Sequence, residues 1–254
     1  RDNHELDLSF LRDFYTEKYA SLATDLLTCR HVISVINDPV SLLRTIRKNL
    51  DQHPDTIVYF DTPNLEYTFR DKIIWNVVYE HRSWFGESSL RYLLESTGFE
   101  VLNIDLCWQD EYIGIEARPK PDFREADWPA ASQLDALKSM VDEFTNAYDQ
   151  LMAANQEKVA ELQARGLRCM AWGAGARAVS FFNLFDLTEQ VPDIVDINVK
   201  RQGKYLPGTA QSIVTPEYLK NYHPELVIIT NPTYADEIKA QVHELGIQPE
   251  FWVL

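Results

Sequence analysis

Apolar and polar residues follow one another along the first half of the chain in a way that predicts strands and helices in turn. Short runs of branched aliphatic residues predict buried strands, whereas apolar residues three or four positions apart predict amphipathic helices. Pro39 suits the first turn of one such helix, and Gly98 suits the end of the next. The predicted elements are strands at Leu22–Thr28 and Ile57–Phe60, helices at Val40–Leu50 and Glu87–Thr97, and a hairpin of strands at Phe99–Trp108 and Tyr112–Arg118.

The second half repeats this alternation after a long helical stretch. Ala131–Arg165 contains neither glycine nor proline and is rich in strong helix formers, which predicts one or two helices. Strands that alternate with helices imply a parallel sheet covered on both faces. Beyond Gly166 the predicted elements are strands at Arg168–Trp172, Asp193–Asp196, Leu226–Thr230 and Phe251–Val253, and helices ending near Phe185 and at Pro216–Tyr222 and Tyr234–Leu245.

These patterns divide the chain into three parts. The first α/β pattern spans residues 1–120, and the second spans residues 166–254. Between them lies a segment, residues 121–165, whose proline-rich and charged beginning gives way to the helical stretch. In the last part Phe181, Phe182 and Phe185 follow helical spacing and are predicted to lie in the core.

The composition argues against some classes of partner but does not identify a particular one. The formal net charge of −15 repels phosphate backbones and anionic lipids, which argues against nucleic acid and membrane partners and leaves a small-molecule substrate. Cys29, Cys107 and Cys169 lie far apart and form neither a metal-ligand spacing nor an even set for disulfides. A reduced, cytoplasmic protein without a bound metal is therefore expected, and the sequence does not decide its oligomeric state.

A pair of glycines opens the second α/β pattern. Gly173 and Gly175 stand between a predicted strand and a predicted helix, where backbone N–H groups can face a phosphate. Ala178 can serve as the third small residue of a dinucleotide fingerprint, and Asp196 as its ribose-binding acid. The alternative is that the glycines only permit a tight turn. Spacing alone leaves the two interpretations equal.

Longer strings in the same region are more specific. Ala171–Arg177, Asp196–Asn198 and Lys200–Thr209, which reads KRQGKYLPGT, resemble the C-terminal domain of a family of C-methyltransferases. That family depends on S-adenosylmethionine and includes enzymes that act on nucleotide-linked keto-deoxysugars. The resemblance covers roughly residues 166–254, and it implies a Rossmann-like domain that holds no nicotinamide cofactor.

The first half resembles the same family at three places. Cys29–Val32, followed by Asn37–Pro39, resembles the arginine-histidine-valine signature after the fourth strand of the cofactor-binding fold. Phe60–Asn64 resembles the end of the fifth strand, and Tyr79–Phe85 resembles the glutamate-histidine motif. The resemblance therefore implies an α/β chain in which a partial class I methyltransferase sheet precedes a Rossmann-like parallel domain.

The sequence departs from the family in two of these motifs and in one larger feature. Ser34 and Val35 stand where the signature usually has a glutamate and a second histidine. Val78 and Tyr79 stand where the sugar enzymes usually have a tyrosine and a histidine before the glutamate-histidine pair. The glycine-rich turn that holds S-adenosylmethionine would precede the first predicted strand, but no glycine occurs there. We therefore expect this chain to be the C-terminal portion of a longer enzyme, or a degenerate relative, and to bind the cofactor weakly or not at all alone.

Methylation of carbon requires a base that removes a proton next to a carbonyl, and a donor for the resulting oxyanion. His81 is the candidate base because imidazole titrates near neutrality. Glu80 can orient His81 or act as a second base, and Tyr79 can donate to the oxyanion. In an extended segment Glu80 would face away from the other two, so all three could not act together. Without the family resemblance, His81 would be interpreted as a loop residue.

The remaining candidates concern binding. Arg30 and His31, after a buried strand, are predicted to line the cofactor pocket, and the alternative for both is a packed loop residue. An arginine at position 30 could also bind a substrate phosphate. Asn64 lies at a strand end where ligands of parallel sheets bind. Substrate contacts are predicted for Asn64, Arg177, Lys200 and Lys204, whereas the alternative for the three cations is solvated loop side chains.

Three functions compete on this sequence. The first is the substrate-side portion of a methyltransferase acting on a carbon next to a carbonyl, in a small, nucleotide-sugar-like substrate. The second is a non-catalytic ligand-binding or interaction domain that has lost the cofactor site. The third, a nicotinamide-dependent oxidoreductase, rests on Gly173 and Gly175 alone and is the weakest.

Overall fold

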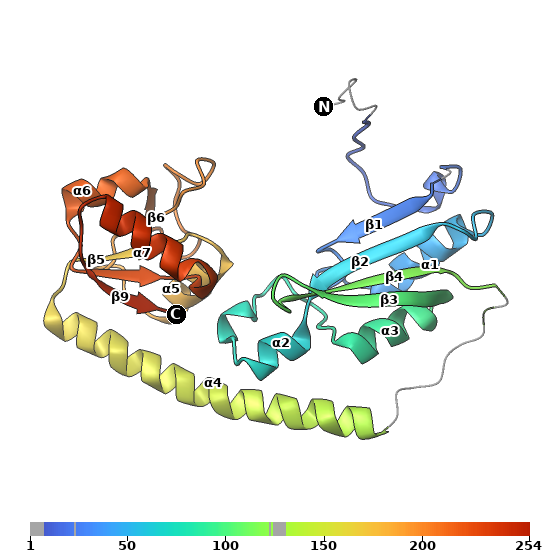
Figure 1. Cartoon of the computed structure of the whole chain (residues 1–254), viewed down its shortest axis with the longest axis horizontal. Coiled ribbons are helices and arrows are strands. Elements are labelled where there is room, and N and C mark those ends of the chain that lie inside the picture. The colour runs from blue at the N-terminus through green and yellow to red at the C-terminus, as the bar shows by residue number, and fades with distance from the viewer. Residues whose placement is uncertain (1–7, 23, 122, 124–130) are drawn as a thin grey trace. The chain divides into compact units, whose positions relative to one another are not determined.

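A computed structural model describes residues 8–22, 24–121, 123 and 131–254. Most of the proline-rich stretch before Ala131 lies outside these residues. The chain divides into two compact units, each considered by itself below. The first unit contains the residues up to 71 and residues 79–141, and the second contains residues 72–78 and 142–254 (Figure 1).

The first unit is built on a four-stranded sheet. Its spatial order is β1-β2-β4-β3, in which β1 and β2 are parallel and the hairpin strands β3 and β4 are antiparallel. The hairpin therefore folds back so that its second strand lies against β2. The strands are β1 (Leu26–Arg30), β2 (Ile57–Pro63), β3 (Phe99–Cys107) and β4 (Tyr112–Pro119).

Helices cover one face of this sheet. The buried faces of α1 and α3 share one apolar cluster with the inward side chains of β2 and β4, so both helices pack on the same side (Figure 1). Asp38 begins α1 by accepting a hydrogen bond from the Ser41 amide at 2.9 Å. The helical elements are a 3-10 turn (Glu17–Tyr19), α1 (Pro39–Asn49), α2 (Leu65–Arg70), a 3-10 turn η2 (Ile74–Asn76) and α3 (Glu87–Glu95).

Two differences from the predicted elements concern the first sheet. The first strand begins at Leu26 rather than Leu22, because its pairing with β2 begins at Leu26 and Ile57. Leu22 lies before the sheet and is 57% exposed. The shift brings Arg30 into the strand as its last residue. Helix α2 was not predicted, because six residues are too few for a periodic pattern.

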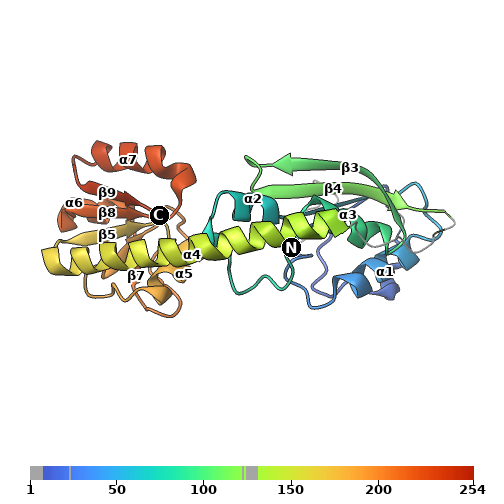
Figure 2. The same cartoon turned by 90° about the horizontal axis from the view of Figure 1, so that it is seen from below.

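The second unit is a five-stranded parallel sheet of order β7-β6-β5-β8-β9. One apolar cluster joins α5 and residues of α4 to one face, and another joins α6 and α7 to the opposite face (Figure 2). The predicted core residues Phe181, Phe182 and Phe185 are at most 4% exposed. The strands are β5 (Cys169–Trp172), β6 (Asp193–Val195), β7 (Ser212–Val214), β8 (Leu226–Ile229) and β9 (Glu250–Val253).

The helices of this unit follow the prediction closely. The glycine-free stretch forms one helix, α4, and the short strand β7 is the element that the sequence pattern did not reveal. The helices are α4 (Ala131–Arg165), α5 (Ala176–Leu184), α6 (Leu219–Tyr222) and α7 (Ala235–Glu244), with 3-10 turns at Pro216–Tyr218 and Pro232–Tyr234.

A short segment from the first half of the sequence belongs to the second unit. Residues 72–78, between α2 and α3 in the chain, include η2, whose Ile74 and Trp75 join the core around α5. The Trp75 ring lies edge-to-face against Phe181, with 5.3 Å between ring centroids. Residues 72–78 lie within the predicted first part, residues 1–120, although they pack with the second unit.

Candidate functional site

A buried carboxylate organises the end of the first two strands. Because β1 and β2 are parallel, Arg30, His31 and Asp61 come together at the same edge of the sheet. Asp61 is 3% exposed, and it accepts hydrogen bonds from Arg30 Nε at 2.7 Å and from the His31 amide at 2.8 Å. The hydrogen bond between Arg30 and Asp61 raises the pKa of Arg30. Both residues predicted at the cofactor are therefore held by one carboxylate.

The side chain of His31 remains accessible. Its backbone adopts a left-handed conformation with φ of 54°, which turns the chain sharply after β1. The imidazole lies edge-to-face with Tyr112 at 4.8 Å, and its side chain is half exposed. The Arg30 side chain is 58% exposed, although its Nε atom donates to Asp61. The imidazole and the free edge of the guanidinium can therefore contact a ligand that lies over this end of the sheet.

Asn64 is already engaged with the protein. It is 4% exposed, its side-chain oxygen accepts from the Glu66 amide at 3.0 Å, and its side-chain nitrogen donates to the Asp110 carbonyl at 3.0 Å. These contacts begin α2 and fix the β3–β4 turn. The predicted contact of Asn64 with a substrate stays a prediction.

The glutamate-histidine motif forms a turn rather than an extended segment. Tyr79 is 92% exposed and Glu80 is exposed, so neither is held beside His81 by the protein. His81 is half-buried, with its ring edge-to-face against Trp84 at 5.0 Å. Burial lowers its pKa below the ordinary value, and the charge of Glu80 opposes this shift only in part. The shift in pKa therefore favours the neutral form of the imidazole.

Backbone contacts bring the motif to the edge that carries Asp61. The carbonyl oxygen of Ser34 accepts from the amides of Arg82 at 2.8 Å and Ser83 at 3.1 Å. Asn64 and Phe85 form a parallel bridge on the β2 side. The segments after β1, β2 and η2 therefore meet in the first unit, although about fifty residues separate the first from the last.

Arg177, Lys200 and Lys204 lie in the second unit. The Arg177 guanidinium donates to the side-chain oxygens of Asn76 at 3.2 Å and Asn231 at 2.9 Å, so it ties the 72–78 segment to the end of β8. Lys200 and Lys204 are exposed on the loop between β6 and β7. Their predicted substrate contacts stay predictions, and the contacts of Arg177 show a structural role.

The glycine pair of the second unit already faces an anion of the protein itself. The Asp196 carboxylate accepts from the Ala174 amide at 2.9 Å and pairs with Arg201 at 3.0 Å. Gly173 has φ of 103°, and an added Cβ would lie 2.5 Å from the Thr230 hydroxyl oxygen. Asp196 thus occupies a backbone donor that a dinucleotide phosphate would need. The geometry favours the interpretation of these glycines as a tight turn.

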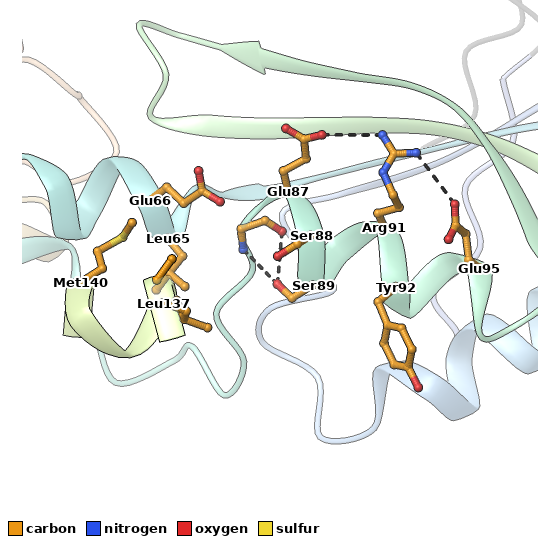
Figure 3. A pocket seen from close by; sticks show the side chains of 12 residues that line it. Leu65, Glu66, Glu87, Ser88, Ser89, Arg91, Tyr92, Glu95, Leu137 and Met140 are labelled. Atoms are coloured by element: carbon orange, nitrogen blue, oxygen red, sulfur yellow. Dashed lines mark hydrogen bonds and ion pairs between the residues drawn. The ribbon is translucent and has the colours of Figure 1, made fainter. Parts of the chain in front are cut away.

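A cavity of about 510 Å³ lies elsewhere on the first unit, between α2, α3 and the beginning of α4. Arg91 stands between Glu87 and Glu95 at its rim, at 3.6 Å and 3.8 Å, while Leu137 and Met140 supply apolar surface (Figure 3). The described lining residues include none of the predicted site residues. The cavity is therefore a separate feature from the edge that carries His81.

Comparison with known families and proteins agrees with this arrangement. A family described as "C-methyltransferase C-terminal domain" matches residues 130–253, and one described as "Methyltransferase domain" matches residues 3–104. The chain belongs to the C-methyltransferase family. A related curated protein, C-methyltransferase NovU of Streptomyces niveus, is 26% identical over 196 residues, which are 73% of this chain and 46% of that protein. The chain thus spans about half the length of the curated relative that it matches.

Among solved structures, the N,N-8-amino-8-demethyl-D-riboflavin dimethyltransferase RosA of Streptomyces davawensis is similar to this chain. The similarity covers 39% of this chain and 30% of RosA. The identity is 21% and the TM-score 0.33. In the described part of this family member, no helix is long and apolar enough to cross a membrane.

The sequence did not identify two residues that organise this site. Asp61 belongs to the Phe60–Asn64 motif but has no role assigned by the sequence, and Ser34 stands out in the sequence only as a departure from the family. An acidic residue at the end of a buried strand was a usable signal, because a buried carboxylate requires partners. No comparable signal existed for Ser34, because its contacts are made through its backbone carbonyl.

Proposed function

We propose that this chain supplies the substrate side of an S-adenosylmethionine-dependent methyltransferase that methylates a carbon next to a carbonyl. The observation that carries the proposal is His81, a half-buried imidazole whose pKa is lowered and which is anchored to the edge that carries Arg30 and His31. A base must be unprotonated at the working pH to accept a proton. Burial of His81 lowers its pKa and so favours that form.

His81 takes a proton from the carbon beside the carbonyl, and negative charge then develops on the carbonyl oxygen. Tyr79, exposed and two residues before His81, is available to donate to that oxygen. Glu80 raises the proton affinity of His81 through its charge and so opposes the effect of burial. The resulting carbanion is the nucleophile of the methylation.

The fit of this edge to S-adenosylmethionine is partial. The accessible side chains of Arg30 and His31, held by Asp61, suit one side of the cofactor. Among its described residues, however, the first sheet has no strand followed by a glycine turn and a helix, the arrangement that would hold the amino-acid end. When bound, the cofactor supplies an electrophilic methyl group. The residues of this chain contribute the base and the edge that faces that group.

Proton abstraction can be tested without the cofactor. In heavy water, the chain should catalyse deuterium exchange at the carbon next to the carbonyl of a nucleotide-linked keto-deoxysugar, as followed by proton NMR. His81→Gln should slow the exchange about 100-fold or more, the usual contribution of a general base. His243→Gln, at an exposed position of the second unit, is the matched control and should exchange at the wild-type rate.

Two results would contradict the proposal. One is wild-type exchange no faster than that of the free sugar nucleotide, and the other is His81→Gln exchange equal to wild type. In either case a non-catalytic binding domain is the better description. Calorimetric titration with S-adenosylhomocysteine tests the cofactor separately: weak or undetectable binding is expected, and submicromolar binding would show that the described edge suffices.

A further inference from the structure

The glutamate-histidine motif lies where the chain passes from one unit to the other. Residues 72–78 belong to the second unit, and the first unit resumes at Tyr79. Directly after the motif, the amides of Arg82 and Ser83 donate to the Ser34 carbonyl at 2.8 Å and 3.1 Å. The second unit therefore holds the chain directly before the motif, and the first unit holds it directly after.

A charged side chain of the second unit anchors the segment before the motif. Arg177, in the first turn of α5, is half-buried. Its Nε atom donates to Asn76 Oδ1 at 3.2 Å, and one of its terminal nitrogens donates to Asn231 Oδ1 at 2.9 Å. The same Asn231 oxygen accepts from the Thr233 amide, in the 3-10 turn that follows β8, at 3.2 Å. Because a guanidinium holds its donors in a rigid, planar fork, it fixes Asn76 relative to the end of β8.

Asn76 passes this restraint to the residues that lead into the motif. It is the last residue of η2, and its carbonyl oxygen accepts from the Val78 amide at 2.9 Å. Val78 is directly followed by Tyr79, whose side chain is 92% exposed. Packing of its own side chain therefore does little to place Tyr79, and the backbone before it decides where its hydroxyl lies.

The apolar and polar contacts of the 72–78 segment have different roles. Ile74 and Trp75, 6% and 7% exposed, hold the segment in the core around α5. Apolar burial is not directional, whereas a hydrogen bond depends on the distance and angle between the atoms that it joins. Loss of the bond from Arg177 should therefore leave the segment in the core but loosen the residues that follow Trp75.

We propose that Arg177 is a positioning residue, which acts through Asn76 to hold Tyr79 where its hydroxyl can donate to the oxyanion. The proposal rests on the proposed function for the use of Tyr79, and on the hydrogen bonds of Arg177 and Val78 for the restraint itself. It differs from the substrate contact that the sequence predicts for Arg177. Loss of a substrate contact raises KM, whereas loss of a positioning contact lowers the turnover number.

The restraint can be measured without a substrate. Amide hydrogen exchange of 15N-labelled protein, followed residue by residue by NMR, reports the protection of the Val78 amide. Arg177→Ala and Asn76→Ala should each accelerate exchange of that amide about tenfold, the usual effect of losing one hydrogen bond. The amides of β5 and β8 should keep their wild-type protection.

The Asn76 variants keep this test decisive if Arg177→Ala fails to fold. Asn76→Ala removes the same hydrogen bond from its other partner, and Asn76→Asp keeps an oxygen that accepts from the guanidinium. The Val78 amide should therefore be less protected in Asn76→Ala and protected as in the wild type in Asn76→Asp. An unchanged Val78 amide in Asn76→Ala would overturn the proposal.

The deuterium-exchange assay of the sugar carbon connects the restraint to function. Arg177→Ala and Asn76→Ala should each lower the turnover number about tenfold at unchanged KM, and the double variant should be no slower than either, because both remove the same bond. In a Tyr79→Phe background, Arg177→Ala should have no further effect. Arg168→Ala is the matched control, because it removes an exposed guanidinium at the opposite end of β5, and it should keep the wild-type rate.

The outcomes separate this proposal from the proposed function. A raised KM at unchanged turnover in Arg177→Ala would show a substrate contact and overturn the proposal, as would additive losses in the double variant. A wild-type chain that exchanges the sugar carbon at a rate that Arg177→Ala leaves unchanged would refute the proposal and leave the proposed function standing. A Val78 amide loosened by Arg177→Ala, in a chain whose wild type does not exchange the sugar carbon, would establish the restraint and refute the proposed function.

Discussion

The segment 72–78 should stabilise the second unit through Trp75, and this can be measured. Trp75 is 7% exposed and contacts two aromatic rings, Phe181 of α5 at 5.3 Å and Phe185 directly after α5 at 6.3 Å between centroids. A buried tryptophan removes roughly 200 Å² from water, which at about 25 cal/mol per Å² corresponds to about 5 kcal/mol. The methyl group that remains in Trp75→Ala recovers a small part, so a loss of about 4 kcal/mol is expected.

The loss should appear in the second unit only. Amide hydrogen exchange, resolved by mass spectrometry of peptides, reports the opening free energy of β5 and β8 separately from that of β2 and β4. Since about 1.4 kcal/mol corresponds to a factor of ten, exchange of the β5 and β8 amides should accelerate up to about a thousandfold. The amides of β2 and β4 should keep their wild-type protection.

An exposed tryptophan provides the control. Trp108 is 73% exposed in the β3–β4 turn, and Trp108→Ala should change stability by less than about 0.5 kcal/mol. The reasoning would be refuted if Trp75→Ala left β5 and β8 protected, since Trp75 would then contribute no packing energy to that core. Equal loss of protection in both units would refute the division of the chain, because it would show one cooperative structure.

Three further predictions concern single residues. Gly173→Ala should destabilise the second unit by about 2 kcal/mol in urea unfolding, because of its positive φ and blocked Cβ position, whereas Gly175→Ala meets open space and should be tolerated; equal effects would contradict this. Burial raises the pKa of Cys29 and of Cys169 to about 11, so both thiols should resist alkylation at pH 8 until the chain unfolds, as mass spectrometry can show. Because the pKa of His81 is lowered on folding, its protonation should reduce stability as pH falls below about 6.5; an NMR titration giving a pKa at or above that value would disprove it.

Most helices and strands could be predicted because the sequence signals for each of them lie within the element or directly beside it. The helix at Pro39–Asn49 combines an N-cap, a proline in its first turn and apolar residues at helical spacing, and all three signals lie within twelve positions. The hairpin of β3 and β4 is similarly local. The strand that was misplaced, β1, is the one whose limits depend on pairing with β2 thirty residues away rather than on its own apolar run.

The contacts that the sequence could not reveal join residues far apart in the chain. Trp75 lies in a short apolar run of the sequence, but the core in which it is buried includes Phe181, more than one hundred positions later. Asp61 binds the His31 amide, a partner that the sequence does not indicate. Ser34 acts through its carbonyl oxygen, so its role does not follow from the type of its side chain. The segments after β1 and β2 that resemble the family lie at the same end of the sheet because those two strands pair in parallel.

The two sheets of this chain differ in how they use the ends of their parallel strands. In the second sheet, Asp196 bonds to the glycine turn and Arg201 pairs with that carboxylate, so the protein provides its own anion where a ligand phosphate would bind. In the first sheet, the described residues leave the hydroxyls of Ser34 and Thr62 and one nitrogen of His81 buried and unpartnered. Unpaired buried groups are costly and persist where binding or catalysis uses them. The search for chemistry in this family member therefore belongs at the first sheet, although the second carries the more familiar glycine motif.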